Sequence, residues 1–211
     1  MTGLALPPSP WGDRHRRRVG LLGGSFNPAH AGHRHISLQA LYRLGLDEVW
    51  WLVSPQNPLK PVAGMAPQAD RVKGALRVAD HPAIRVTDIE TRLGTRYTAD
   101  TLTVLTRRFG NTRFVWLMGA DNLQQIARWD RWTNIFRTVP VAVFDRSPYS
   151  YKAQASKAAR RFAWARLSGR KAFGLADRRT PAWVFLHTRR HPASATAIRR
   201  RAGQQPVTAD I

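Results

Sequence analysis

Short apolar runs alternate with longer stretches of helical spacing along most of the chain. The runs predict strands at residues 19–22, 48–53, 84–88, 113–118, 139–144 and 182–187. Helical spacing predicts helices from about Ala31 to Gly45 and at residues 69–80, 99–109 and 152–167. The run at 48–53 is apolar on both faces, as in a parallel sheet covered by helices. The alternation therefore indicates an α/β fold with a mainly parallel sheet flanked by helices.

The first predicted strand runs into a glycine turn and then a helix. The turn is Gly-Gly-Ser-Phe-Asn-Pro at residues 23–28, and the helix begins near Ala31. Backbone N–H groups and a helix N-terminus in this arrangement can hold a phosphate. His30 and His33 lie three residues apart, so both imidazoles can face one anion, and Gly32 permits close approach. The turn lacks the Lys and Ser/Thr of a P-loop and the third glycine of a dinucleotide fingerprint.

Composition narrows the class of protein without deciding it. Among 211 residues, 43% are hydrophobic and eight are tryptophan, which is typical of a folded globule. The absence of cysteine excludes disulfides, thiolate metal sites and cysteine nucleophiles. Thirty-four Lys and Arg against thirteen Asp and Glu give a formal charge of +21, which favours anionic partners, either nucleotides or nucleic acid. The arginines are scattered along the chain, and no nucleic-acid-binding motif includes them.

The chain is expected to form a single domain at residues 19–205, preceded by a disordered or loosely held basic tail at residues 1–18. No apolar stretch approaches the ~20 residues of a membrane span, and the first 18 residues have no apolar core of signal-peptide length. We therefore expect a cytoplasmic protein without a membrane partner. Whether it forms a homo-oligomer is left open.

The sequence GGSFNPAHAGH at residues 23–33 closely resembles the signature of the nucleotidyltransferase superfamily, and specifically of bacterial nicotinate-nucleotide adenylyltransferases. Those enzymes more often have Asp where this chain has Asn27. The resemblance continues in order to Arg199. It implies a Rossmann-like, doubly wound sheet and the transfer of AMP from ATP to nicotinate mononucleotide, giving deamido-NAD and pyrophosphate. It also implies Mg²⁺ carried by the ATP phosphates, with no metal-ligating residues named.

The same resemblance implies roles for individual residues on the ATP side. The expected catalytic residues are His30, His33 and Arg199. The expected ATP-binding residues are Gly24, Ser25, Phe26, Gly32, Ser194 and Thr196. Ala195 replaces the second serine that is usual in the terminal motif, so at most one hydroxyl contact is lost.

On the acceptor side the resemblance implies a second set, which follows other predicted strands. The expected mononucleotide-binding residues are Lys60, Tyr97, Thr98, Asp121 and Trp129. Four of the five have a structural alternative: a solvated loop lysine for Lys60, helix capping for Thr98 and Asp121, and packing for Trp129. A flat aromatic face at Trp129 suits stacking on a pyridine ring, whereas Trp132 is assigned to packing.

Other functions remain open at this point. Within the superfamily, related enzymes use nicotinamide mononucleotide or phosphopantetheine, and capture of a carboxylate by backbone N–H groups leaves no mark in a sequence. Outside the enzyme class, the charge permits a basic nucleic-acid-binding protein. The basic segment 152–167 has no interleaved stacking aromatics, so we interpret it as a solvated helix face.

Overall fold

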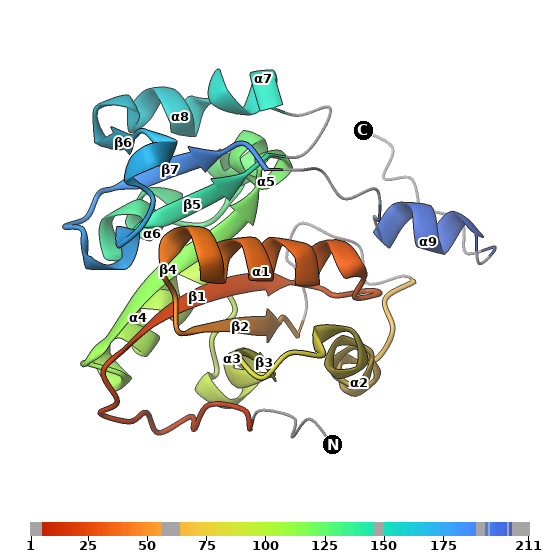
Figure 1. Ribbon diagram of the computed structural model, residues 1–211. Coiled ribbons are helices and arrows are strands. Elements are labelled where there is room, and N and C mark those ends of the chain that lie inside the picture. The colour runs from red at the N-terminus through yellow and green to blue at the C-terminus, as the bar shows by residue number, and fades with distance from the viewer. Residues whose placement is uncertain are drawn as a thin grey trace.

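The computed structural model describes residues 6–55, 64–145, 150–188, 193, 195–201 and 203. Its centre is a seven-stranded sheet in the order β3-β2-β1-β4-β5-β7-β6, with every neighbouring pair parallel (Figure 1). The strands are β1 (Arg17–Gly24), β2 (Glu48–Val53), β3 (Ile84–Thr87), β4 (Thr112–Gly119), β5 (Val141–Phe144), β6 (Arg166–Leu167) and β7 (Trp183–Leu186). The predicted parallel α/β sheet is confirmed.

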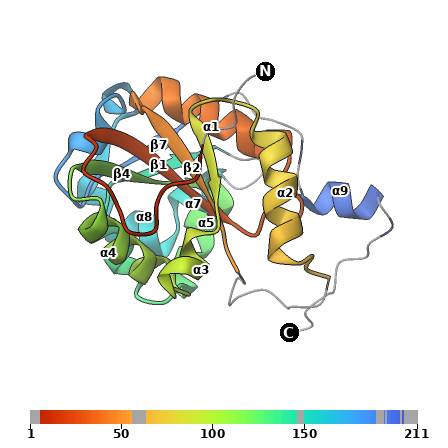
Figure 2. The same ribbon diagram turned by 90° about the horizontal axis from the view of Figure 1, so that it is seen from below.

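Helices cover both faces of the sheet (Figure 2). One face carries α1 (Ala31–Leu44) and α2 (Gln68–Ala79). The other carries α3 (Ile89–Leu93), α4 (Thr98–Arg108), α5 (Ala120–Gln125), α6 (Trp132–Thr138) and α8 (Lys157–Arg161). The remaining elements are α7 (Ser150–Gln154), α9 (Ala195–Arg201), and the 3-10 turns η1 (Ile126–Arg128), η2 (Ala163–Ala165), η3 (Gly169–Lys171) and η4 (Leu175–Asp177). None of the helices in these described ranges is long and apolar enough to cross a membrane.

The central residues of the interior strands are apolar because both faces of the sheet are buried against helices. In β2, Trp50 packs into the cluster under α4, while its neighbour Trp51 packs into the opposite cluster under α1. Both side chains are 0% exposed. Gly45 ends α1 in the left-handed conformation, with φ 66°, as its position predicts.

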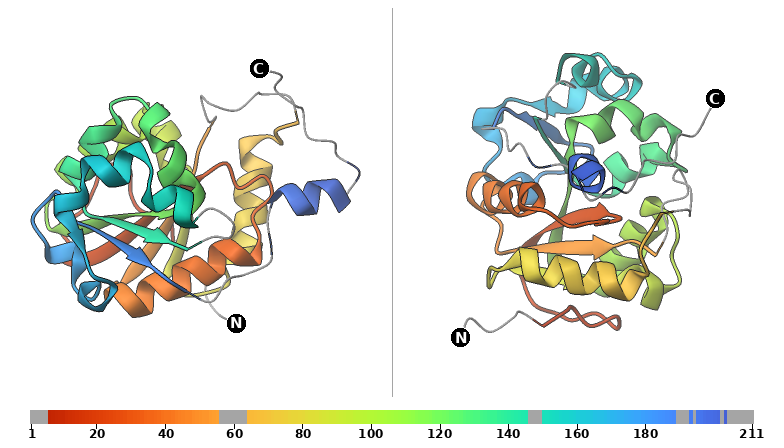
Figure 3. Two further views of the ribbon diagram at one scale, coloured as in Figure 1. Left: turned by 90° about the horizontal axis from the view of Figure 1, so that it is seen from above. Right: turned by 90° about the vertical axis from the view of Figure 1, so that its right-hand side faces the viewer.

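The sheet reverses its winding between β1 and β4. These strands are hydrogen-bonded neighbours, with Leu22 opposite Leu117, although the chain visits β2 and β3 between them. In open α/β sheets such a reversal opens a crevice at the carboxyl ends of the strands, where ligands bind. The helix α9 lies in front of this end of the sheet (Figure 3, right). The fold therefore predicts a ligand-binding site at the segments that follow Gly24 and Gly119.

The prediction of one long basic helix at residues 152–167 is wrong. The segment is broken into α7, α8, η2 and the two-residue strand β6. Ser156 starts a new helix, because its hydroxyl accepts a hydrogen bond from the Ala159 N–H at 3.3 Å. Further along, Arg166 leaves helical geometry to pair with Trp183 at the edge of the sheet. Capping and strand pairing thus override the helical propensity of the segment.

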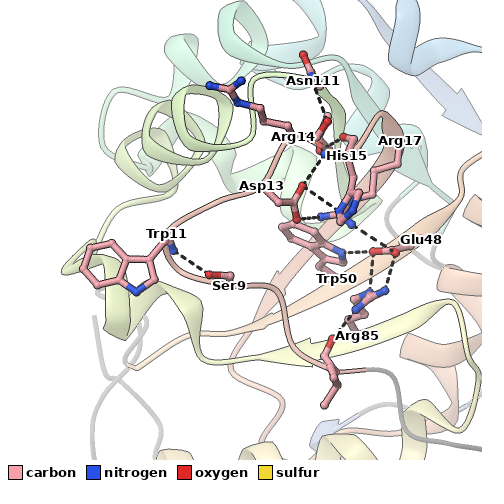
Figure 4. Close-up of polar contacts among 12 residues, drawn as sticks. Ser9, Trp11, Asp13, Arg14, His15, Arg17, Glu48, Trp50, Arg85 and Asn111 are labelled. Atoms are coloured by element: carbon pink, nitrogen blue, oxygen red, sulfur yellow. Dashed lines mark hydrogen bonds and ion pairs between the residues drawn. The ribbon is translucent and has the colours of Figure 1, made fainter.

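The N-terminal segment is also held more firmly than a loose tail. Residues 17 and 18 belong to β1, and residues 6–16 run along the amino end of the sheet (Figure 4). Four of their backbone carbonyls accept side-chain hydrogen bonds from the folded domain. These pairs are Leu6 with Arg85, Pro10 with Arg108, Arg14 with Asn111 and His15 with Thr112. These bonds and the pairing of β1 attach residues 6–18 to the folded domain in the structure.

Candidate active site at the carboxyl end of the sheet

Two imidazoles stand side by side where β1 meets α1. The ring centroids of His30 and His33 lie 3.9 Å apart. His30 is the N-cap residue of α1, and its Nδ1 accepts a hydrogen bond from the Gly32 N–H at 3.1 Å. The His30 N–H in turn donates to Nδ1 of His33 at 3.1 Å. The pair thus forms a reciprocal cap of the kind that Ser and Glu build at other helix starts.

These backbone donors determine which ring nitrogen carries the proton. A Nδ1 atom that accepts an N–H carries no hydrogen, so each neutral ring has its hydrogen on Nε2. His30 is 8% exposed and His33 is half-buried, which limits their freedom to turn. The result is two oriented Nε2–H donors at the positive end of a 14-residue helix.

Aromatic packing supports His33 from the core side. The Phe26 ring, 2% exposed, lies 4.8 Å from the His33 ring and stacks on Trp51 at 5.1 Å. Trp51 Nε1 donates to Ser37 Oγ at 2.7 Å, and that hydroxyl donates to the His33 carbonyl at 2.9 Å. Phe26 has φ 48°, in the left-handed region that favours glycine. The side chain of Phe26 therefore lies in the core and holds the histidine in place.

The start of α9 lies next to the start of α1. A Cβ built on Gly32 would lie 3.1 Å from the Ala193 carbonyl oxygen and 2.9 Å from atoms of the His30 ring. A glycine is needed there, because any side chain would displace one or the other. Thr196 is exposed on the first turn of α9. Ser194 lies outside the described residues.

Arg199 of α9 contacts the glycine turn at residues 23–28, which we call the signature turn. Its Nη1 donates to the Asn27 carbonyl at 2.5 Å, across 172 positions of sequence. The Asn27 side-chain amide donates to the Gly64 carbonyl at 3.0 Å, and its oxygen accepts from the Ala66 N–H at 3.4 Å. An aspartate could not make the donor contact. The substitution of Asn27 for the more usual aspartate thus has a structural use in this chain.

Arg71 was missed by the sequence reasoning, although it contacts the same turn. It is 4% exposed, and its guanidinium donates to the backbone carbonyls of Ser25 at 2.6 Å, Ser54 at 2.8 Å, Pro55 at 2.9 Å and Ala66 at 2.9 Å. Burial lowers the pKa of Arg71 from its ordinary value, yet an arginine stays charged at neutral pH. A signal was present, because Arg71 occupies the buried stripe of α2 together with Ala75 and Ala79.

Tyr97 and Thr98 lie at the start of α4. The helix begins at Thr98, and Tyr97 is its N-cap residue without a side-chain capping bond. The alternative of Thr98 as a capping residue is therefore wrong, since it lies inside the first turn. Without a side-chain cap, first-turn N–H groups are available to an external acceptor such as a phosphate. Lys60, expected nearby, lies outside the described residues.

A buried carboxyl group underlies this helix start. Glu90 is 7% exposed and accepts a hydrogen bond from Thr101 Oγ1 at 3.0 Å. The Thr101 hydroxyl also lies 2.9 Å from Thr95 Oγ1, and the Thr95 N–H donates to the Glu90 carbonyl at 3.0 Å. Burial raises the pKa of Glu90 to about 7, against the lowering effect of the Thr101 bond. The network fixes the chain between α3 and α4.

Asp121 and Trp129 follow the carboxyl end of β4. Asp121 is in the first turn of α5 and lines a cavity of about 380 Å³ with Gln124, Gln125 and Arg128. Trp129 is half-buried and meets Trp116 edge-on, with ring centroids 6.4 Å apart.

The segment that carries Trp129 is tied to the start of α4. Arg131 donates to Asp100 of α4 at 2.7 Å and to its neighbour Asp130 at 2.6 Å. The first bond ties the Trp129 segment to Asp100 in the first turn of α4, two residues after Thr98. Trp132, expected to pack, lies against Phe136 and Phe162 in the core.

The comparisons with known proteins identify the family of this chain. The cytidylyltransferase-like family model matches residues 21–201. A relative from Cereibacter sphaeroides named "Probable nicotinate-nucleotide adenylyltransferase" is 57% identical over 181 residues, which cover 86% of this chain and 96% of the relative. A relative of the same name from Parvibaculum lavamentivorans is 54% identical over 186 residues, which cover 88% of this chain and 92% of the relative.

Solved structures show the same fold at low sequence identity. A Plasmodium falciparum nicotinic acid mononucleotide adenylyltransferase complexed with NaAD superimposes with a TM-score of 0.63 at 15% identity. The same enzyme complexed with APC gives a TM-score of 0.61 at 14% identity, and both matches cover 87% of this chain and 83% of the other. By its sequence relatives, the chain belongs to the cytidylyltransferase-like family and, within it, to the nicotinate-nucleotide adenylyltransferases.

Proposed function

We propose that the chain transfers the AMP part of ATP to nicotinate mononucleotide, giving deamido-NAD and pyrophosphate in NAD biosynthesis. An oxygen of the mononucleotide phosphate bonds to the α-phosphorus of ATP, and the bond from that phosphorus to the bridging oxygen of pyrophosphate breaks. Such a reaction needs no protein nucleophile, but it requires two polyanions held in line and their growing charge neutralised. The observation that carries the proposal is the pair of oriented Nε2–H donors of His30 and His33 at the sheet reversal.

On the ATP side, His30 and His33 donate hydrogen bonds to the phosphates from the start of α1. Gly24, Ser25 and Gly32 let the phosphates approach the backbone of the turn, and the buried Phe26 supports His33. Arg199, with Ser194 and Thr196, holds the β- and γ-phosphates that leave. Its position beside the Asn27 carbonyl supports this role, because a planar guanidinium fork suits phosphate oxygens.

On the acceptor side, the start of α4 receives the mononucleotide phosphate through Thr98 and backbone N–H groups, beside Tyr97. Asp121 binds hydroxyl groups of the nucleotide, and Lys60 faces its phosphate. Trp129 stacks on the pyridine ring. The Arg131–Asp100 bond supports this grouping, since it ties the Trp129 segment to α4.

In this proposal Mg²⁺ enters the site bound to the phosphates of ATP. Among the residues that the structure describes, no three His, Cys, Asp or Glu side chains gather as metal ligands. Mg²⁺ usually keeps most of its waters and is held chiefly by substrate phosphates, so the proposal assigns it no metal-ligating residue. When bound, the ion supplies neutralisation of phosphate charge.

A pyrophosphate-release assay with ATP and a panel of acceptors tests the proposal. Nicotinate mononucleotide is expected to give the highest kcat/KM, about tenfold or more above nicotinamide mononucleotide, since a pocket with N–H donors for a carboxylate discriminates against the amide. 4′-Phosphopantetheine is expected to give no release. Equal turnover of acid and amide would contradict the choice of substrate. Salt-dependent DNA binding without pyrophosphate release from any acceptor would favour a nucleic-acid-binding protein instead.

A further inference from the structure

The buried arginine of α2 differs from the other cations of the site in its surroundings. Four of the five N–H groups of Arg71 donate to backbone carbonyls. In the described part of the chain, no carboxylate lies within ion-pairing distance of its guanidinium. Carbonyl dipoles compensate a buried charge only in part. The net positive charge of Arg71 therefore remains behind the turn that carries Ser25.

The four carbonyls come from three separate segments. Ser25 lies just after β1, Ser54 and Pro55 just after β2, and Ala66 just before α2. Helix α2 lies beside the carboxyl ends of these two strands (Figure 1). One planar side chain thus joins the turns that follow two neighbouring parallel strands.

Other bonds reinforce the same junction. Ser54 donates to the Gly24 carbonyl from its N–H at 3.0 Å and from its hydroxyl at 3.2 Å. The Asn27 side chain bonds to Gly64 and Ala66, while Arg199 bonds to the Asn27 carbonyl. Displacing the Arg71 guanidinium would therefore release the turn at Ser25, two residues before the Asn27 carbonyl that Arg199 contacts.

We propose that Arg71 is a positioning residue for adenylyl transfer, which holds the signature turn against the β2 turn and whose charge is balanced by the phosphates of bound substrate. The inference rests on the proposed function and adds to it a residue whose hydrogen bonds to the described residues all go to backbone carbonyls. It makes two separable predictions. Loss of the planar fork affects the alignment of the reacting groups, and loss of the charge affects phosphate affinity.

The test compares R71K, which keeps the charge but has three donors on a single nitrogen, with R71M, which loses both. R77K and R77M are matched controls, because Arg77 is an exposed arginine of the same helix. We expect kcat/KM to fall roughly 10- to 100-fold in R71K, as misplacement of reacting groups does, with little change in the affinity for inorganic tripolyphosphate by calorimetry. In R71M we expect that affinity also to fall about tenfold or more, since a point charge acts strongly at a dry site.

A purely structural role would give a different pattern. The melting temperature would fall in both Arg71 variants, while kcat, KM and tripolyphosphate affinity of the folded fraction stayed at wild-type values, and that result would overturn the proposal. If R71M does not refold, R71K with its R77K control carries the test of positioning. The turnover of the wild-type protein is measured alongside. A wild-type protein that binds tripolyphosphate but transfers no AMP would refute the proposed function, while the tripolyphosphate affinities of R71K and R71M could still be compared.

Discussion

Two pairs of arginines at opposite ends of the parallel sheet differ in the groups that they contact. At the amino end, cations meet carboxylates: Arg17 bonds to Asp13 at 2.6 Å, and Arg85 forms an ion pair with Glu48 at 2.8 Å (Figure 4). Glu48 also accepts from Trp50 Nε1 at 2.7 Å. At the carboxyl end, the described contacts of Arg71 and Arg199 go to backbone carbonyls alone.

The difference separates structural charge from functional charge. An arginine paired with a carboxylate contributes to folding, and its positive charge is already neutralised before any ligand binds. A cation held only by carbonyl oxygens keeps its net charge, and a polyanion that enters the site supplies the missing partner. In a protein with a formal charge of +21, the number of arginines therefore says less about the site than their partners do.

The largest effect is expected at His33. H33A removes one Nε2–H donor and the Nδ1 acceptor of the His30 N–H, so we expect kcat to fall at least about 100- to 1000-fold with the circular dichroism spectrum retained. H35A, two positions along the same helix, is the control. Near-native kcat in H33A would refute the catalytic role of this residue.

Glu90 extends the comparison to an unmatched carboxyl group. Its pKa of about 7 in the folded protein lies above the ordinary value of 4.5, so its contribution to stability is full below pH 4.5 and is lost as pH rises through 7. We expect the free energy of unfolding in urea to decline by up to a few kcal/mol across this window. E90Q is expected to flatten that decline. An identical pH profile for wild type and E90Q would contradict burial without a cation.

At the amino end the expected effect is on folding alone. E48Q weakens the ion pair with Arg85 at a site where the Glu48 side chain is 14% exposed, so we expect a loss of about 2 kcal/mol in the free energy of unfolding. Activity is the decisive readout, because kcat and both KM values should stay unchanged. A fall in kcat/KM that exceeds the loss of folded protein would break the contrast between the two ends.

The smallest effect is expected at Trp129. W129A removes an aromatic face, which is worth about 1 kcal/mol beyond the buried area. The KM for the mononucleotide should therefore rise about fivefold while the KM for ATP stays constant. W132A is the matched control, and we expect it to lower the melting temperature through lost packing with Phe162. An unchanged mononucleotide KM in W129A would remove this residue from the acceptor site.

The sequence predicted the six longer strands because their central residues form apolar runs, as the exact match of β2 with residues 48–53 illustrates. It failed at residues 152–167, where strand pairing of Arg166 with Trp183 is a long-range event. The His30–His33 pair was found from its motif. Arg71 was not, because its meaning depends on carbonyls of Ser25 and Pro55 that only the folded chain brings together.

The central claim is that the carboxyl end of the sheet holds donors oriented for a triphosphate. The most direct test is a crystal structure with an α,β-methylene analogue of ATP. We predict phosphate oxygens within about 3 Å of Nε2 of both His30 and His33, with Arg199 on the terminal phosphates. Phosphates bound elsewhere on the protein, with neither imidazole in hydrogen-bonding distance, would contradict the account.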